Sequence, residues 1–343
     1  MDAPRPALKK RLLALALGLA VPLLVGELVA RFLFGAPMAE RLPLMFMRAH
    51  PTRGWAMVPG QTHYTYTHEV RVNSLGLRGP EVGPKEPGER RVLFLGDSLT
   101  YGQGVAEEDT VPFALERALE ARTGAPWTVI NAGHRAYDTA QELALFDELA
   151  PGLAPDYVLL GWYWNDVNER PIRTTFENLT PKGEIAFDTG DRVEGADRLR
   201  WELKQLARRS ALVMVVHDLF SGKGKPYPPD YFERGLARLG RYLEHLRVRS
   251  EQLGARAVFV QYPDKARLAG AAETEAWELR ALALAGERGL VAIELLPALV
   301  ALQSASGRTP ILPFDGHYDG EANRAMGAHL AAELLRLAPP PER

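Results

Sequence analysis

A serine flanked by glycines is the first feature of this chain that points to chemistry. Ser98 lies in the string GDSLTYG at residues 96–102, directly after the apolar run Val92–Leu95. Such a run predicts a buried strand, and open α/β folds bind ligands outside the carboxyl ends of their strands. The glycines allow a tight turn and a close approach by a substrate. Ser98 is therefore a candidate nucleophile, with an ordinary strand-to-loop turn as the alternative interpretation.

A serine hydroxyl is a poor nucleophile until a base removes its proton. Of the eight histidines in the chain, His317 is the best placed to do so, because its loop leads into the amphipathic segment Glu321–Leu335. Asp315 precedes His317 by two residues, so its carboxylate can orient the imidazole. Ser98, His317 and Asp315 would thus form a Ser-His-Asp triad. The simpler interpretation of His317 is a surface loop residue.

Acyl transfer also needs hydrogen-bond donors for the negative oxygen that develops in the reaction. Gly133 ends the second expected strand in the string NAG at residues 131–133, and Asn165 follows the third in GWYWND at residues 161–166. The Gly133 N–H and the Asn165 side-chain amide are therefore expected to join the Ser98 N–H in an oxyanion hole. Both residue types are also common in turns, which is the alternative explanation for each.

Buried strands alternate with amphipathic helices from Arg91 onward, which is typical of a parallel sheet covered on both faces. The strands are expected at Val92–Leu95, Thr128–Ile130, Tyr157–Leu160, Ala257–Gln261 and Val291–Glu294. The helices between them are expected at Thr110–Arg122, Thr139–Leu149, Tyr231–Leu253 and Glu273–Arg288. Five such strands predict a doubly wound, three-layer α/β domain over residues 91–338, whose carboxyl edge would carry the candidate site.

Two segments depart from this alternation. Residues 36–90 are rich in proline, glycine and polar residues, with an alternating pattern at 62–67 and 70–72, and predict a linker with a small β embellishment. Residues 167–229 predict an insertion beside the site, with an apolar helix around Leu212–Phe220. This helix is expected to cap the sheet, with a lid as the alternative. Lys223 and Lys225 lie in a loop that matches no phosphate-binding pattern and are expected to be solvated.

The first 35 residues predict a membrane segment. Basic residues precede an apolar run that extends from Leu12 to Phe34, with Glu27 and Arg31 near its far end. The run approaches the ~20 residues of a spanning helix, and the leading charges predict a cytoplasmic amino terminus with the rest of the chain exported. We expect an uncleaved anchor rather than a cleaved signal peptide, because no small-x-small cleavage site follows. A buried core helix is the third interpretation.

Composition excludes several classes of function. The chain has 343 residues, 46% of them hydrophobic, and a formal net charge of −2, so nothing in it favours nucleic acid as a partner. It contains no cysteine, which excludes a thiol nucleophile, disulfides and thiolate metal sites.

These motifs together resemble the SGNH (GDSL-type) hydrolase superfamily, whose four blocks carry Ser, Gly, Asn and His in that order. The matching blocks are residues 96–102, 131–133, 165–166 and 315–317. By resemblance, Ser98 is the nucleophile, Gly133 and Asn165 serve the oxyanion hole, and His317 is the base. The resemblance implies a flavodoxin-like α/β/α sandwich, acyl-ester chemistry, and neither metal nor cofactor. Residues 54–79 also resemble the region that precedes the catalytic block in membrane-anchored bacterial members.

The chain departs from the family pattern in two places. Many members carry the acid three residues before the histidine, where this chain has Phe314, so Asp315 is the expected acid and Asp319 the second choice. Tyr163 stands two residues before Asn165, in place of the family's glycine. The aromatic run at residues 162–164 would line an acyl or sugar pocket or simply pack beneath the loop.

The first functional hypothesis is a membrane-anchored, exported serine esterase that hydrolyses small acyl esters, such as acetyl groups on cell-envelope glycans. The second hypothesis is an O-acyltransferase that uses the same triad with a sugar hydroxyl as acceptor. The third is a non-catalytic envelope assembly or binding protein of the same fold. The expected partners are the ester or acylated glycan and the membrane.

Overall fold

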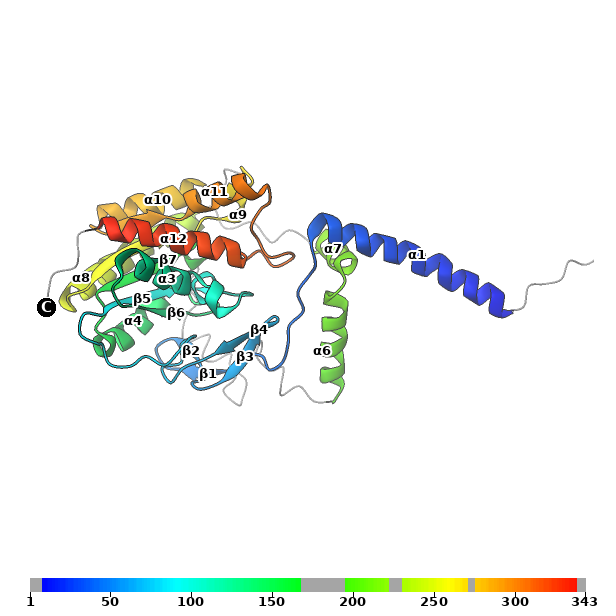
Figure 1. Cartoon of the computed structure of the whole chain (residues 1–343), viewed down its shortest axis with the longest axis horizontal. Coiled ribbons are helices and arrows are strands. Elements are labelled where there is room, and N and C mark those ends of the chain that lie inside the picture. The colour runs from blue at the N-terminus through cyan, green and yellow to red at the C-terminus, as the bar shows by residue number, and fades with distance from the viewer. Residues whose placement is uncertain (1–7, 168–194, 222–229, 271–274, 338–343) are drawn as a thin grey trace, which may run out of the picture. The chain divides into compact units, whose positions relative to one another are not determined.

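The computed structural model describes residues 8–167, 195–221, 230–270 and 275–337 (Figure 1). They fall into two compact units. The helical unit consists of Met1–Glu40, Val193–Pro226 and Pro313–Asp315, and the sheet unit of Arg41–Arg192, Tyr227–Leu312 and Gly316–Arg343. Much of the expected insertion, including Lys223 and Lys225, lies outside the described residues.

A five-stranded parallel sheet forms the centre of the sheet unit. Its strands lie in the order β6 (Trp127–Gly133), β5 (Arg90–Gly96), β7 (Tyr157–Trp162), β8 (Arg256–Gln261) and β9 (Val291–Glu294). In chain order this is 2-1-3-4-5, the flavodoxin-like arrangement, in which ligands bind where the strand order reverses between the first and third strands. The predicted α/β sandwich is confirmed, and the end of β5 lies at that reversal.

Helices cover both faces of this sheet because each strand alternates its side chains between them (Figure 1). Leu93 and Leu95 share a core with one helix layer, whereas Val92 and Phe94 share a core with the other. The first layer contains α4 (Thr139–Leu153), α8 (Tyr231–Gln252) and α10 (Glu275–Glu287). The second contains α3 (Val111–Thr123), α11 (Leu296–Ser306) and α12 (Gly320–Arg336). Both faces are therefore buried, as the near-continuous apolar strands predicted.

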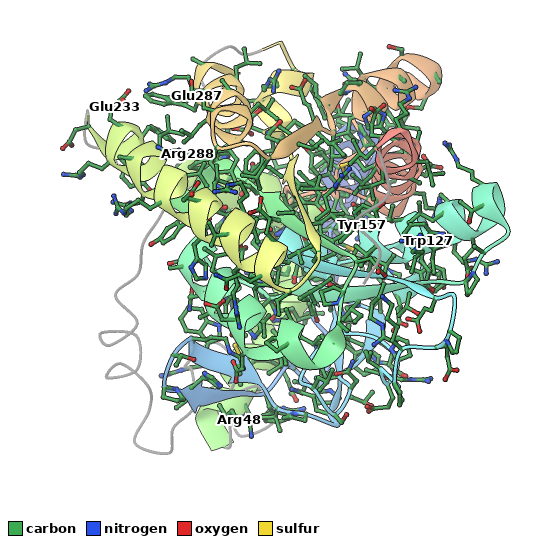
Figure 2. All side chains as sticks on the ribbon, turned by 90° about the vertical axis from the view of Figure 1, so that its left-hand side faces the viewer. Arg48, Trp127, Tyr157, Glu233, Glu287 and Arg288 are labelled. Carbon is green, nitrogen blue, oxygen red and sulfur yellow. The ribbon has the colours of Figure 1, made fainter. Side chains whose placement is uncertain are left out.

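The two ends of the sheet differ in character. At the amino ends of β6 and β7, the rings of Trp127 and Tyr157 stack with centroids 6.1 Å apart and close this end with apolar surface (Figure 2). The carboxyl ends carry short helical turns instead: α2 (Ser98–Tyr101) after β5, η2 (Trp164–Val167) after β7 and α9 (Lys265–Leu268) after β8. A further turn, η1 (Glu107–Asp109), precedes α3. The polar end is therefore the one that can hold a site.

The segment before β5 is more than the expected linker with a β embellishment. It forms two antiparallel pairs, β1 (Met47–His50) with β2 (Gly54–Met57) and β3 (Thr62–Thr65) with β4 (His68–Arg71). Trp55 and Val70, from two of these strands, are buried in the same core cluster as residues of α4 and α8. The segment from Arg41 onward is therefore part of the sheet unit.

Strand β6 forms one edge of the sheet, and a side chain covers part of that edge. The Val129 N–H donates to Glu116 Oε2 of α3 at 2.7 Å, where a further strand would otherwise pair. Burial raises the pKa of the Glu116 carboxyl, against the hydrogen bond from Val129. A backbone donor on this edge is thus satisfied within the chain.

The helical unit is built on α1 (Leu8–Phe34), in which Lys10–Phe34 is long and apolar enough to cross a membrane. Helices α6 (Gly195–Arg208) and α7 (Ala211–Phe220) belong to the same unit, and α7 lies beside the end of α1 (Figure 1). Glu27 of α1 accepts hydrogen bonds from Ser210 Oγ and the Ala211 and Leu212 N–H groups at 2.6–3.0 Å. The apolar helix expected around Leu212–Phe220 is therefore present, but it packs on α1 and not on the sheet as a cap.

Candidate active site

The candidate nucleophile occupies the first position of a four-residue helix. Asp97 is the N-cap of α2 and accepts a hydrogen bond from the Leu99 N–H at 2.8 Å, so Ser98 is held directly beyond the end of β5. The helix ends at Gly102, whose φ of +85° suits glycine. Ser98 is half-buried, whereas its neighbours Asp97 and Leu99 are buried.

Glycines at the strand ends make room for α2. A Cβ on Gly161, at the end of β7, would lie 2.6 Å from Thr100 Oγ1 and 2.8 Å from the Tyr262 ring. A Cβ on Gly133, at the end of β6, would overlap the backbone of Thr100 and Tyr101. The close approach of α2 to both strands therefore explains why glycine stands at these two positions.

His317 lies against the candidate nucleophile. Its Nε2 is 2.8 Å from Ser98 Oγ, although 219 residues separate the two in the chain. The loop that carries His317 is closed by a bridge between Ile311 and Tyr318 and by the Leu312 N–H, which donates to the His317 carbonyl at 2.8 Å. The Tyr318 hydroxyl donates to the Pro263 carbonyl at 2.5 Å, which fixes the loop beside the turn after β8.

The two carboxylates considered as the acid have different surroundings. Asp319 is the N-cap of α12, accepts from the Ala322 N–H at 2.9 Å and pairs with Arg308 at 2.6 Å. Its oxygens are thus committed to the helix and to the arginine. Asp315 belongs to the segment Pro313–Asp315 of the helical unit, and its role as the acid stays a prediction.

Gly133 does not present its N–H as expected. The Gly133 N–H donates to the side-chain oxygen of Asn131 at 3.0 Å, so it is already satisfied. Gly133 serves instead as the place where α2 crosses β6, as its missing Cβ shows. The expectation failed because a side chain two residues earlier in the chain competes for the amide.

Asn165 lies beside Asp97 in the structure. The Asn165 side chain interacts with the Asp97 carboxyl and lowers its pKa, but burial is the larger influence and raises it. Asp97 Oδ2 and Asn165 Oδ1 are buried and have no hydrogen-bond partner among the described residues. Buried polar groups are rarely left unpaired except where a site uses them. The third block is thus brought to the nucleophile loop as expected.

The aromatic run before Asn165 divides between core and site. Trp162 is 1% exposed and belongs to the core beneath the sheet, so it packs instead of lining an open pocket. Tyr163 and Trp164 are half-buried, and the Tyr163 hydroxyl lies 3.4 Å from Asp264 Oδ1. The Tyr163 N–H donates to Asp166 Oδ2 at 2.7 Å, which shapes the turn around Asn165.

Three buried carboxyl groups lie in and below this part of the site. Burial raises the pKa of Asp97, Glu142 and Asp166, and for Glu142 and Asp166 the neighbouring carboxyls raise it further. Neither oxygen of Glu142 has a hydrogen-bond partner among the described residues. The low-dielectric surroundings therefore favour neutral carboxylic acids beneath the nucleophile loop.

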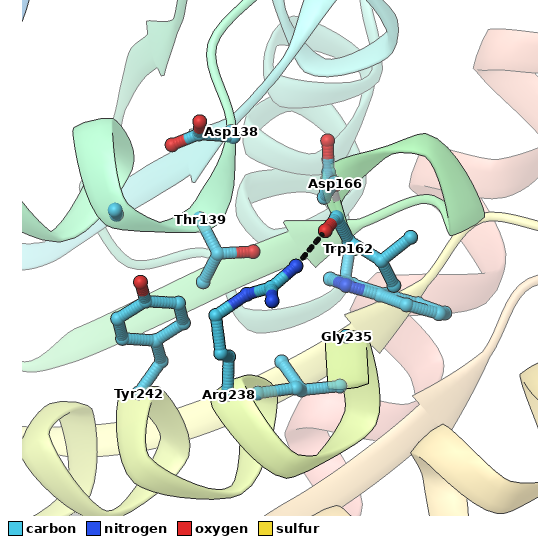
Figure 3. A pocket seen from close by; sticks show the side chains of 10 residues that line it. Asp138, Thr139, Trp162, Asp166, Gly235, Arg238 and Tyr242 are labelled. Atoms are coloured by element: carbon cyan, nitrogen blue, oxygen red, sulfur yellow. Dashed lines mark hydrogen bonds between the residues drawn. The ribbon is translucent and has the colours of Figure 1, made fainter. Parts of the chain in front are cut away.

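A cavity of about 240 Å³ opens near these groups, between β7, α4 and α8 (Figure 3). Arg238 Nη2 donates to the Val167 carbonyl at 2.6 Å across it. The lining residues shown in Figure 3 include Asp138, Thr139, Trp162, Asp166, Gly235, Arg238 and Tyr242. Neither Ser98 nor His317 lines this cavity, so it is separate from the serine–histidine pair.

Sequence reasoning missed two residues that hold α2 from the β segment. The buried Arg78 guanidinium donates to the carbonyls of Tyr101, Gly102 and Val105 at 2.7–3.0 Å. His63 Nε2 lies 2.8 Å from the Tyr101 hydroxyl, and burial lowers the pKa of His63 to about 3, so its imidazole is neutral near pH 7. No local motif marks either residue, because their partners lie 23 to 38 residues away.

Ala136 is the third residue that was missed. It follows β6 in the loop before α4, is exposed, and has a φ of +62°, which is rare for a residue with a Cβ. Its N–H donates to no acceptor among the described residues. Strained backbone of this kind gathers at functional sites. The only sequence signal is its distance of three residues from Gly133.

Across the described ranges, no group of three or more His, Asp or Glu side chains is arranged to hold a metal ion. The arrangement is one of organic groups alone: a hydroxyl, an imidazole and amides at the carboxyl edge of a parallel sheet. Such groups can carry out nucleophilic acyl transfer.

Several solved structures are similar to the chain at low identity. A lipase/acylhydrolase from Enterococcus faecalis is 16% identical, with a TM-score of 0.42 over 74% of this chain and 100% of that one. A lipase from a goat rumen metagenome is 13% identical, with a TM-score of 0.45 over 71% and 96%. An acetyl xylan esterase is 12% identical, with a TM-score of 0.41 over 71% and 99%. No curated protein matches the chain.

The family is shown by sequence instead. The model of the GDSL-like lipase/acylhydrolase family matches residues 94–325, more than half of the chain. The match includes Ser98, Asn165 and His317, which the fold brings to one edge of the sheet. The chain therefore belongs to the GDSL-like lipase/acylhydrolase family.

Proposed function

We propose that the protein is a serine esterase that cleaves small acyl esters through an acyl-enzyme. The observation that carries the proposal is the 2.8 Å distance between Ser98 Oγ and His317 Nε2. A base at hydrogen-bond distance from a hydroxyl at the end of a strand is the arrangement that activates a serine.

The proposed reaction has two halves. Ser98 Oγ attacks the ester carbonyl as His317 Nε2 takes its proton, and the alcohol then leaves with that proton, so that an acyl-serine remains. Water attacks the acyl-serine with His317 again as the base, and the carboxylic acid is released. Asp315 is proposed to hold the imidazole with Nε2 toward Ser98.

The oxyanion hole is proposed to consist of three donors. The Ser98 N–H lies in the first turn of α2, where helix N–H groups have no partner within the helix. The Asn165 amide, held beside Asp97, is the second donor. The exposed N–H of Ala136 replaces that of Gly133 as the third, because the Gly133 amide is bonded to Asn131.

The anchor supports a substrate in the cell envelope, such as an acetylated glycan. Helix α1 is proposed to remain attached, because Glu27 bonds three groups of the segment 210–212 and Arg31 donates to the Arg209 carbonyl at 2.5 Å. A signal peptide that is removed has no use for such contacts. The mass of the protein recovered from membranes tests this: a chain that begins after residue 35 would contradict an anchor.

The test of the chemistry is hydrolysis of a short-chain chromogenic ester by the full chain in detergent. Ser98→Ala is expected to abolish turnover above the background rate. Ser221→Ala is the matched control, because Ser221 Oγ also lies near a histidine, 3.0 Å from His217 Nδ1, but is fully exposed and outside the fold's carboxyl edge. Turnover that survives in Ser98→Ala would overturn the mechanism.

A serine-directed fluorophosphonate separates the esterase from a non-catalytic protein of the same fold. Labelling at Ser98 that is lost in His317→Ala supports an activated serine. A folded protein that takes up no label would contradict it. Adding glycan acceptors to the assay then shows whether water or a sugar hydroxyl receives the acyl group.

A further inference from the structure

The helical unit exposes an apolar surface on α6 and α7. Seven large apolar side chains there are 44–85% exposed: Leu199, Leu203, Leu206, Val213, Val216, Leu219 and Phe220. Isolated apolar residues are common on protein surfaces, but a contiguous set marks a surface that contacts a protein or a membrane.

Helix α6 has the composition of a helix that lies in a membrane interface. Leu199, Leu203 and Leu206 are spaced by four and three residues and therefore share one face. The remaining positions carry four basic residues, Arg198, Arg200, Lys204 and Arg208, against two acidic ones. An apolar face bordered by basic residues is attracted to anionic lipid headgroups.

Helix α7 is apolar throughout except for His217 and Asp218 near its end. Its ten residues rise only ~15 Å, about half of the hydrocarbon thickness, so it cannot cross a bilayer. Val213, Val216 and Phe220 follow helical spacing and lie on one exposed face. A short helix of this kind lies at a membrane surface or is partly inserted.

The contacts between α1 and α7 set the depth of α7. The uncharged run Leu12–Gly26 has 15 residues and rises ~22 Å, less than the ~30 Å of hydrocarbon. Glu27 therefore lies at the hydrocarbon boundary, where an unpartnered carboxylate is costly. Arg31, Ser210 and the first N–H groups of α7 bond it.

The packing of the same two helices supports this depth. Leu212 of α7 lies so close to Gly26 that a Cβ there would be 3.2 Å from Leu212 Cδ2. The start of α7 is thus held at the level of the last uncharged turn of α1. Its apolar face continues the apolar surface of a helix that is itself exposed along its whole length.

We propose that α6 and α7 lie in the interface of the membrane that α1 crosses. The occupant of their apolar face is the acyl-chain region, and the basic residues of α6 contact anionic headgroups. The inference depends on α1 as a membrane span and is independent of the esterase chemistry.

Site-directed spin labelling tests the proposal, and the natural chain has no cysteine to remove. Leu203→Cys, Val216→Cys and Phe220→Cys would be labelled in the full chain, reconstituted in phosphatidylcholine vesicles with or without phosphatidylglycerol. Leu19→Cys in α1 is the control for the span. Val300→Cys on α11, 47% exposed against 44% for Val216, is the matched control on the sheet unit.

The readout is the ratio of collisions with oxygen, which enters lipid, to collisions with a water-soluble nickel complex. The three α6–α7 labels are expected to give a ratio several-fold above that of Val300, and higher still with phosphatidylglycerol. A ratio equal to that of Val300, with Leu19 in the bilayer, would overturn the proposal. So would shielding from both reagents with spin–spin broadening that dilution by unlabelled protein removes, because a second copy would then cover the face. A water-exposed Leu19 would remove the span on which the inference depends.

Discussion

Asp97 and Glu27 each accept backbone N–H groups at the start of a helix, but they reach that helix by different routes. Asp97 stands directly before α2 and is buried within the sheet unit. Glu27 comes from α1 and bonds residues 183 to 185 positions later, at the start of α7. A local cap is written in a motif, whereas a distant one is visible only when both helices are in place.

The two caps also serve different ends. The first holds the hydroxyl of Ser98 against His317, where a small displacement costs reactivity. The second holds one helix on another among exposed apolar side chains, where displacement costs only attachment. Changes at Asp97 should therefore affect turnover, and changes at Glu27 should affect local stability alone.

The largest effect is expected for Asp97→Ala. Without the cap the first turn of α2 loosens, and a displacement of about 1 Å at a nucleophile costs roughly a hundredfold in rate. Asp97→Asn is the matched variant, because asparagine caps helices about as well as aspartate. It should recover most of the turnover of the short-chain ester. Equal losses in both variants would show that the charge, and not the cap, is needed.

The far end of α2 sharpens the comparison, because a distant residue holds it. Arg78→Met would leave three buried carbonyls at residues 101, 102 and 105 without their charged donor. The free energy of unfolding of the full chain in detergent should fall by about 3 kcal/mol or more. Arg71→Met, in the same segment but with a side chain 78% exposed, should change it by less than ~0.5 kcal/mol. Similar losses would contradict the role of Arg78.

Glu278 is a third carboxylate that serves a distant helix, this time within the protein. Its Oε1 accepts from the Asp264 N–H at 2.6 Å, beside the start of α9, and Arg267 pairs with it at 2.7 Å. Burial nevertheless raises the pKa of Glu278 from 4.5 to about 7. The folded state therefore binds this proton more tightly than the unfolded chain does, and stability falls as pH rises through that window.

Glu278→Gln should remove this dependence. Between about pH 5 and about pH 8, the unfolding free energy of the natural chain should fall relative to the variant by up to ~3 kcal/mol. Glu287→Gln, exposed on the same helix α10, should track the natural chain at every pH (Figure 2). Parallel profiles for Glu278→Gln and the natural chain would show that the carboxyl is charged throughout.

The smallest effect is expected for Glu27→Ala. Loss of the cap should weaken the start of α7 by ~1–2 kcal/mol, which amounts to about a tenfold faster amide hydrogen exchange at residues 212–216. Turnover of a soluble ester should not change. Glu333→Ala, which removes a surface pair with Arg336 but no cap, is the control and should leave exchange in α7 unaltered. Unaltered exchange in Glu27→Ala would contradict the capping role.

The sheet and the serine–histidine pair could be predicted because their signals are local. Each buried strand is a run of apolar residues, and each candidate group follows such a run or lies in a loop beside a helix. The roles of Gly133 and Ala136 could not be predicted, because they depend on where the Asn131 side chain turns and on one backbone angle. The place of α7 depends on a carboxylate 183 residues away, which no periodicity reveals.

The covered edge of β6 has a consequence for molecules that share one bilayer. Diffusion in a plane keeps tethered domains close together, and a bare strand edge would then invite them to join through main-chain pairing. With Glu116 occupying the Val129 N–H, such pairing would first have to break an existing bond. A single glutamate thus works against self-association in the crowded setting where this enzyme would operate.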